Sequence, residues 1–103
     1  MCGIAGAAGF RRRGRGGLEQ NVERMCKEQA HRGPDGSGLF FENGVCLGHR
    51  RLSILDLTDS GAQPMVSKTG RFVISYNGEI YNYKVLAKKL QKKDPHMTFR
   101  GDC

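Results

Sequence analysis

The sequence predicts an α+β fold in which helices cover a mostly antiparallel sheet. Three observations lead to this prediction. Apolar residues recur at helical spacing from Leu18 and again from Tyr83. Between these segments lie short apolar runs separated by Asn-Gly and other glycine-containing turns, which are typical of hairpins. With 103 residues, of which 38% are hydrophobic, the chain predicts one domain at most, with a small core.

The first half of the chain predicts a strand, a loop, a helix and a second loop. Residues Cys2 to Ala8 are small and apolar, which fits a buried strand, and the Gly/Arg-rich residues 9–17 indicate an exposed loop. From Leu18 the spacing becomes helical. Residues 31–38 contain three glycines and a proline, which indicates a structured loop. The helix is expected to bury one face made of Leu18, Val22, Met25, Cys26 and Ala30.

A first hairpin is predicted in the middle of the chain. Leu39–Glu42 and Val45–Gly48 flank Asn43-Gly44, which is a strong signal for a two-residue turn. Residues 52–57 then alternate apolar and polar side chains, and this pattern breaks at residues 58–64.

A second hairpin and a tight turn follow. Met65-Val66 and Arg71–Tyr76 flank the turn at Lys68–Gly70. Asn77-Gly78 is expected to form a tight turn immediately afterwards. Residues 97–99 are a candidate for one more strand.

A second helix is predicted from Tyr83 to Lys93. Its lysines fall on one side and its apolar residues on the other, which is typical of a surface helix. Asp94-Pro95 ends it, because a residue before proline disfavours the helical conformation. The side expected to be buried is made of Tyr83, Leu86, Ala87 and Leu90.

The charge is strongly basic, with 17 Lys and Arg against 10 Asp and Glu. The basic residues form two separate clusters, Arg11–Arg15 and Lys84–Lys93, rather than one stripe. We favour a basic loop plus the solvated face of a helix. The alternative is a small basic nucleic-acid-binding module that uses the Arg/Gly-rich segment to bind phosphates. No apolar run approaches the roughly 20 residues of a membrane span, so no membrane partner is expected.

The four cysteines form no metal-binding pattern, and no metal site is expected. Without an export signal we expect reduced thiols and a cytoplasmic location. Cys2 stands apart because it follows the initiator methionine. Removal of Met1 would give Cys2 a free α-amine with an ordinary pKa of about 7.7–8.0. That amine can accept the thiol proton, so one residue supplies nucleophile and base; the alternative is a buried, unreactive cysteine.

Three further segments, residues 31–36, 48–54 and 76–82, supply what hydrolysis of an amide needs. The Asn77 side chain and the Gly78 backbone N–H can donate to an oxyanion. An arginine of the second segment can bind a carboxylate through two parallel hydrogen bonds. Glu79 or Asp102 can accept from an ammonium group. A substrate with a carboxamide, a carboxylate and an ammonium group is an amino-acid amide, such as glutamine.

The motifs resemble a known family. They are Cys2-Gly3-Ile4-Ala5-Gly6, HRGPDGSG from His31, GHRRLSILDL from Gly48, GAQPM from Gly61 and YNGEIYNY from Tyr76. Together they are similar to the class II glutamine amidotransferase domain, the N-terminal-nucleophile type, and most similar to the glutamine-hydrolysing asparagine synthetases. The resemblance covers nearly the whole chain. It implies an αββα sandwich, the N-terminal-nucleophile hydrolase fold.

The resemblance also implies roles for individual residues. Cys2 matches the catalytic nucleophile, and Asn77 and Gly78 match the oxyanion hole. Arg51, preferred over Arg50 because it directly precedes Leu-Ser-Ile, matches the residue that binds the α-carboxylate of L-glutamine. The remaining glutamine contacts implied are Leu52, Ser53, Ile54, Leu55, Glu79 and Asp102, the last binding the α-amine.

The resemblance also implies that residues 1–103 are the N-terminal part of a longer domain, about half of it. The synthetase domain that would follow uses ATP and Mg to activate aspartate for the released ammonia, and it is absent here. No cofactor is expected in this chain. We expect weak or no glutaminase activity from it alone, although a short form that binds glutamine without hydrolysis is a third possibility. Full-length relatives are often homo-oligomeric.

Overall fold

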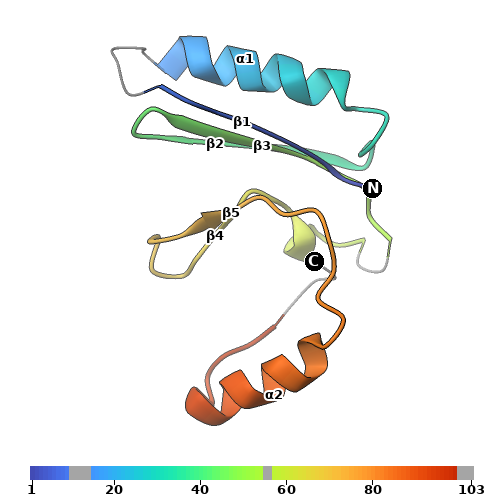
Figure 1. The fold of residues 1–103 in the computed structure, drawn as a ribbon, viewed down its shortest axis with the longest axis vertical. Helices are drawn as coiled ribbons and strands as arrows, with labels where there is room; N and C mark the ends of the chain where they lie inside the picture. The colour runs from blue at the N-terminus through green and yellow to red at the C-terminus, as the bar shows by residue number, and fades with distance from the viewer. Residues whose placement is uncertain (10–14, 55–56, 100–103) are drawn as a thin grey trace.

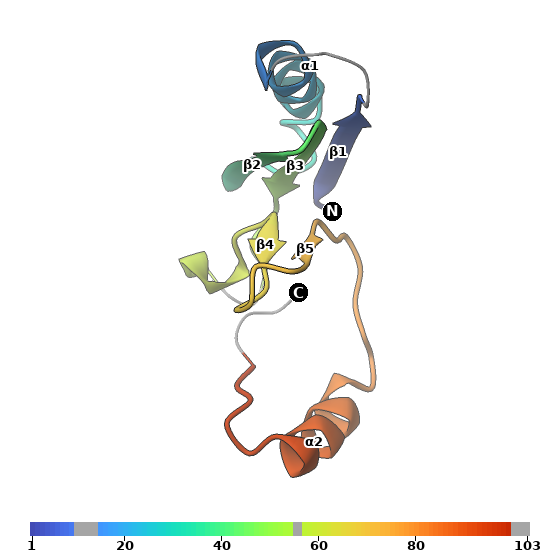
Figure 2. The same cartoon turned by 90° about the vertical axis from the view of Figure 1, so that its left-hand side faces the viewer.

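The computed structural model describes residues 1–9, 15–54 and 57–99. A three-stranded antiparallel sheet carries α1 (Arg15–Glu28) across one face, as Figure 1 shows. A short two-stranded sheet and a 3-10 turn, η1 (Asp59–Gly61), lie on the opposite side, and α2 (Tyr83–Lys93) lies beyond them (Figure 2). The strands are β1 (Gly3–Ala8), β2 (Gly36–Glu42) and β3 (Val45–Arg51) in the order β1-β3-β2, and β4 (Met65–Val66) paired with β5 (Val73–Ile74).

The core lies between α1 and the three-stranded sheet. Leu18, Val22 and Cys26 of the helix are buried against Cys46 of β3. Gly48 allows the helix to pack directly on the backbone of β3, because a Cβ at this position would lie only 2.8 Å from the Val22 side chain. The core is completed by the partly buried Ala5, Ala7 and Phe41.

The Asn43-Gly44 hairpin is confirmed. Both residues have positive φ, 51° and 75°, as the two-residue hairpin turn requires. The strands are longer than predicted, since β2 begins at Gly36 and β3 continues to Arg51. The extra residues pair Gly36 with Arg51 and Gly38 with His49. The added residues are mostly glycine, polar or charged, so they show no alternation of apolar and polar side chains. The alternation in the sequence therefore stops before the ends of the strands.

The face of the sheet turned away from α1 is polar at the end where β1 begins. Side chains of β3 alternate between the faces, so His49 and Arg51 lie on this side, opposite the core. Both are buried, with exposed fractions of 1% and 7%. Residues 58–76 cover them, and the Gln63 carbonyl lies so close to Gly38 that a Cβ there would clash with it. This packing places the residues after β5 beside the start of β1.

The predicted order of strand, helix, antiparallel strands and helix is confirmed, and α2 has the predicted bounds. The first helix begins at Arg15 instead of Leu18, so residues 15–17 are helical; residues 10–14 of the expected loop lie outside the described residues. The prediction that Met25 is buried is wrong, because it is 43% exposed. At 3.6 residues per turn it lies about 60° away from Val22 around the helix, at the border of the buried stripe. Ala30 lies beyond the helix end and is half-buried.

The prediction of a buried first strand is also wrong. β1 is an edge strand, paired with β3 on one side only. Its side chains alternate between exposed and partly buried, and Ile4 is 48% exposed. The small apolar residues of this strand contact α1 on one face, while the other face is largely open.

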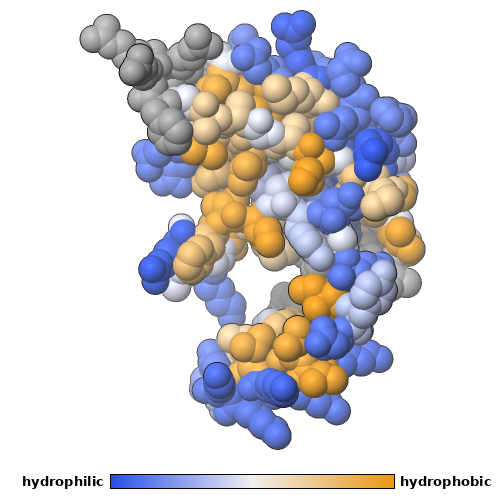
Figure 3. All heavy atoms as spheres, in the orientation of Figure 1, coloured by the Kyte–Doolittle hydropathy of each residue, from blue (hydrophilic) through white to orange (hydrophobic). Residues whose placement is uncertain are grey.

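The predicted burial of α2 is wrong as well. Within the described residues α2 contacts no other helix or strand. Tyr83 and Leu90 are therefore exposed by 58% and 42%, although they fall on the apolar side that the sequence indicates. Figure 3 shows hydrophobic side chains over α2 on the side toward the rest of the molecule and hydrophilic ones on the far side.

The remaining local predictions are met in part. The second hairpin forms, but its strands are short and β5 is limited to Val73–Ile74. Asn77-Gly78 forms a bend without positive φ instead of a tight turn. Residues 52–54 and 97–99 are not strands. Within the described residues neither helix is long and apolar enough to cross a bilayer.

Candidate active site around Cys2

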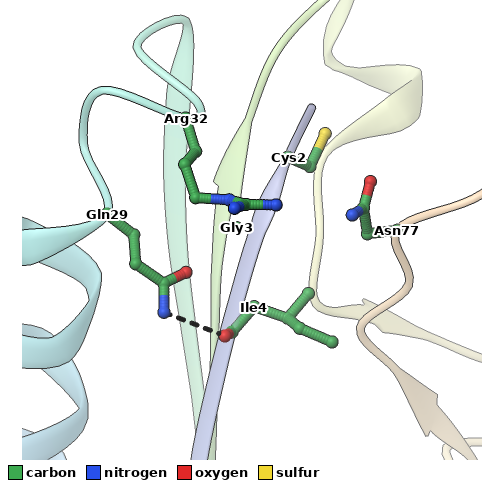
Figure 4. Close-up of a pocket in the computed structure, with 6 residues that line it drawn as sticks. All are labelled: Cys2, Gly3, Ile4, Gln29, Arg32 and Asn77. Carbon is green, nitrogen blue, oxygen red and sulfur yellow. Dashed lines mark hydrogen bonds between the residues drawn. The ribbon is translucent and has the colours of Figure 1, made fainter.

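An open pocket of about 320 Å³ lies where β1 begins. Figure 4 shows that three parts of the chain reach it: the start of β1, the loop that follows α1, and the segment that follows β5. Cys2 and Asn77 therefore face the same pocket, although they are far apart in the sequence. The lining residues are Cys2, Gly3, Ile4, Gln29, Arg32 and Asn77.

The thiol of Cys2 is fixed by one backbone unit. The side chain is 7% exposed, and its Sγ accepts a hydrogen bond of 3.3 Å from the N–H of Leu52. The same sulfur lies 3.8 Å from the Leu52 carbonyl oxygen, to which the thiol donates. Because Leu52 directly follows β3, the sheet sets the position of the sulfur.

The loop after α1 holds the Leu52 segment in place. The Asp35 carboxylate accepts a 2.8 Å hydrogen bond from the N–H of Ser53, and the Asp35 N–H donates to the Arg51 carbonyl at 2.9 Å. Arg50 donates from Nε to the Gly33 carbonyl at 3.0 Å. These contacts, on both sides of Leu52, give the motif from His31 a physical role. It fixes the backbone that contacts the thiol.

The two adjacent arginines point to opposite sides of the sheet. Arg50 is bound to the loop, whereas Arg51 passes under the turn at η1 and donates from Nη1 to the Thr58 carbonyl. Gly61 makes room for the Arg51 guanidinium, because a Cβ there would lie 2.9 Å from its Cζ. The choice of Arg51 over Arg50 for the substrate carboxylate stays a prediction, and the structure gives Arg50 a structural partner.

Burial sets the protonation of two groups near the site. Burial lowers the pKa of His49, and the positive charge of Arg51 lowers it further. Burial also raises the pKa of Cys26, a core thiol on the opposite face of the sheet from His49. The raised pKa favours the neutral thiol form of Cys26, which is the less nucleophilic form. Among the described residues, no three His, Cys, Asp or Glu side chains gather as a metal site.

A family model described as the glutamine amidotransferase domain matches residues 1–103. The chain belongs to the glutamine amidotransferase domain family. The similarity between its five motifs and this family, inferred from the sequence, is therefore confirmed. Nothing in the comparisons supports the nucleic-acid-binding alternative.

Curated relatives of this amidotransferase domain are named as asparagine synthetases. The chain is 38% identical over 107 residues to a putative glutamine-hydrolysing asparagine synthetase 2 of Methanocaldococcus jannaschii, with 86% of this chain and 20% of the relative covered. It is 43% identical over 79 residues to a probable asparagine synthetase of Schizosaccharomyces pombe, covering 77% and 14%. It is 38% identical over 103 residues to asparagine synthetase 2 of Arabidopsis thaliana, covering 100% and 17%. The chain thus spans a fifth or less of these relatives' lengths.

The structure brings together some of the residues predicted for the glutamine site. Cys2 and Asn77 line one pocket, and the backbone of Leu52 contacts the thiol. Gly78, the next residue in the chain, lies against the Tyr76 ring, because a Cβ at Gly78 would lie 2.9 Å from the Tyr76 Cζ. Ser53 donates its N–H to Asp35, while Ile54 and Glu79 are exposed outside the pocket lining. Leu55 and Asp102 lie outside the described residues.

Two residues that line this pocket were not predicted from the sequence. Arg32 projects toward Cys2 from the loop after α1, and Gln29 lies beside it (Figure 4). Gln29 Nε2 donates to the Ile4 carbonyl at 3.3 Å, so it contacts the edge of β1. The position of Arg32 in the motif from His31 was the available signal. Gln29 falls at the end of a helix, where a polar residue is ordinary.

Proposed function

We propose that this chain supplies the glutamine-hydrolysing site of an amidotransferase, with Cys2 as nucleophile after removal of Met1. The observation that carries the proposal is the common pocket of the Cys2 thiol and the Asn77 side chain. A thiol and an amide donor facing one cavity are the two groups that attack on a carboxamide requires. Membership of the glutamine amidotransferase domain family gives the substrate class.

The proposed reaction proceeds through a thioester. The α-amine of Cys2 takes the thiol proton, and the sulfur attacks the side-chain carboxamide of L-glutamine, forming an S–C bond. The Asn77 side-chain NH₂ and the Gly78 N–H donate to the resulting oxyanion. Collapse breaks the C–N bond, and the α-ammonium returns the proton to the leaving ammonia. Water then hydrolyses the thioester, releasing glutamate and restoring the thiol.

Binding of the amino-acid end of glutamine is assigned to the other predicted residues. Arg51 binds the α-carboxylate, and Asp102 binds the α-amine. A guanidinium has five N–H donors, so the contact of Arg51 with the Thr58 carbonyl is compatible with a further acceptor. The rest of the proposed glutamine contacts are Leu52, Ser53, Ile54, Leu55 and Glu79.

The wider assignment concerns a longer protein. The two sheets with α1 on one side are proposed as part of an αββα sandwich of the N-terminal-nucleophile type. Following the names of the curated relatives, the ammonia would pass to aspartate, activated with ATP and Mg in a separate synthetase domain. The chain itself uses no cofactor in this proposal, and the reaction takes place in the cytoplasm.

Covalent labelling tests the proposal directly. The chain is treated with the chloromethyl ketone analogue of glutamine. The thiolate adds to the ketone carbon, which places an oxyanion where Asn77 and Gly78 would donate, and the sulfur then moves to the CH₂ carbon, displacing chloride, forming the final S–C bond and restoring the ketone. Intact mass and peptide mapping should show removal of Met1, one adduct on Cys2, and protection by L-glutamine. Cys46→Ala is the control that keeps the adduct, and Cys2→Ala should lose it. Labelling that glutamine does not slow, or that survives Cys2→Ala unchanged, would overturn the proposal.

Turnover gives the second measurement. Glutamate and ammonia released from L-glutamine are followed for the chain and for Cys2→Ala. We expect weak or no release, with any release dependent on Cys2, because the pocket is open and much apolar surface is exposed. Measurable release of equal size from both proteins would contradict the assignment of Cys2.

A further inference from the structure

We propose that Gln63 and the His49–Ser75 pair are positioning residues that hold Asn77 at its place opposite Cys2. This inference rests on the proposed function and adds residues to which no role has been given above. The segment needs such support because β5 ends at Ile74, and the next three residues are not part of either sheet. The described hydrogen bonds that hold this segment are made by the Ser75 hydroxyl and by the backbone N–H of Tyr76.

The first contact comes from Gln63. Its side chain is 7% exposed, and Oε1 accepts a short 2.6 Å hydrogen bond from the N–H of Tyr76. Gln63 is itself fixed, because its carbonyl packs against Gly38 of β2, where no Cβ would fit. The residue directly before Asn77 is therefore tied to the three-stranded sheet through one buried side chain.

The second contact comes from Ser75 and involves β3. The Ser75 hydroxyl lies 3.3 Å from the Gly48 carbonyl oxygen and 3.0 Å from Nδ1 of His49. A hydroxyl has one proton, so donation to the carbonyl leaves its lone pair for an N–H. Both hydrogen bonds are then satisfied when His49 carries its proton on Nδ1. Burial, which lowers the pKa of His49, keeps the ring neutral in this arrangement.

These two contacts attach the segment before Asn77 to the same sheet that positions the nucleophile. Cys2 directly precedes β1, and Leu52, which contacts its sulfur, directly follows β3. Ser75 and Tyr76 are tied to β3 and to the segment packed on β2. The distance between the thiol and the amide donor is thus set by one sheet. A misplacement of about 1 Å at such a donor can slow a reaction about a hundredfold.

Side-chain deletions with a matched control test this role. Gln63→Met keeps the length of the side chain but removes the acceptor, and Ser75→Ala removes the hydroxyl. Ser67→Ala is the control, because Ser67 is in the same hairpin and its hydroxyl bonds Phe72 and Thr69, away from the pocket. His49→Asn keeps an N–H at the position of Nδ1, whereas His49→Leu removes it.

The measurement separates positioning from stability. Saturation labelling with the chloromethyl ketone analogue of glutamine gives kinact and KI for each variant, and iodoacetamide reports simple access to Cys2. For Gln63→Met, Ser75→Ala and His49→Leu we expect kinact to fall about ten- to a hundredfold. We expect KI and the iodoacetamide rate to stay within about twofold, and His49→Asn and Ser67→Ala to resemble the unsubstituted chain.

Each alternative result has a distinct meaning. An unchanged kinact in Gln63→Met and Ser75→Ala overturns the positioning role alone. A parallel change in kinact, KI and the iodoacetamide rate shows a merely structural role and also overturns it. If the unsubstituted chain shows no labelling that glutamine protects, the proposed function fails, and the positioning role fails with it.

Discussion

Gly48 gives a quantitative test of how α1 packs on the sheet. In Gly48→Ala the new methyl would contact the Cys26 sulfur and lie 2.8 Å from Cγ1 of Val22, whereas ordinary contacts begin at 3.4 Å. Both neighbours are buried, so the helix itself must move away from β3. Overpacking of this kind destabilises by about 1–3 kcal/mol. This is a large share of the stability of a small domain.

The assay uses a thiol of the core as its reporter. The Cys46 side chain has no exposed surface, so its thiol reacts with a thiol reagent only when the core opens. Its rate in increasing urea gives the free energy of unfolding for each variant. Gly17→Ala is the control, because its new methyl would meet nothing within 4 Å. It should stabilise α1 by about 0.5–1 kcal/mol, as Gly to Ala does inside a helix.

A double variant decides whether the clash is the cause. Cys26→Ala removes the sulfur that the new methyl would contact, so adding it to Gly48→Ala should be less harmful than the sum of the single changes. A coupling of about 0.5–3 kcal/mol is the range for residues in contact. Unchanged stability of Gly48→Ala, or additive effects in the double variant, would refute the packing argument.

Three further results are expected. The pKa of His49 is lowered in the folded chain, so the unfolded chain binds more protons. The free energy of unfolding therefore has its full value above about pH 6.5 and falls with acidification by at most about 1.4 kcal/mol per pH unit. A slope that persists in His49→Leu would contradict this. Asp35→Ala leaves the N–H of Ser53 without its acceptor and should lower the free energy of unfolding by about 1 kcal/mol, measured by urea titration against Asp59→Ala. Asn77→Ala should lower the rate of Cys2-dependent glutamate release about 10²–10³-fold with little change in KM, and an equal rate would exclude Asn77 as an oxyanion donor.

Local elements could be predicted from the sequence because their signals are local. Asn43-Gly44 encodes its own turn geometry, and α2 has the bounds that its spacing and Asp94-Pro95 indicate. Burial could not be predicted in the same way. The exposed faces of β1 and α2 depend on which surfaces meet, and an apolar pattern does not say whether a partner surface is present.

The candidate site likewise contains residues that could be predicted from the sequence and residues that could not. Cys2 and Asn77 were predicted from several motifs taken together and from the family that these motifs resemble, and the structure places both residues in one pocket. Gln63, His49 and Arg32 were not assigned roles, because their positions depend on contacts between distant segments. A buried glutamine that accepts from a backbone N–H 13 residues away leaves no periodic signal in the sequence.

The isolation of α2 has a consequence for how the chain opens. An 11-residue helix that contacts no other helix or strand in the described part of the chain is close to the length at which helices are marginal in water. α2 therefore forms a separate cooperative unit, and its amide protons should exchange with solvent through local opening. Those of α1 and β3 should exchange only when the core opens. We therefore expect the layer that carries the thiol and α2 to differ in protection, and the chain as a whole to unfold in more than one step.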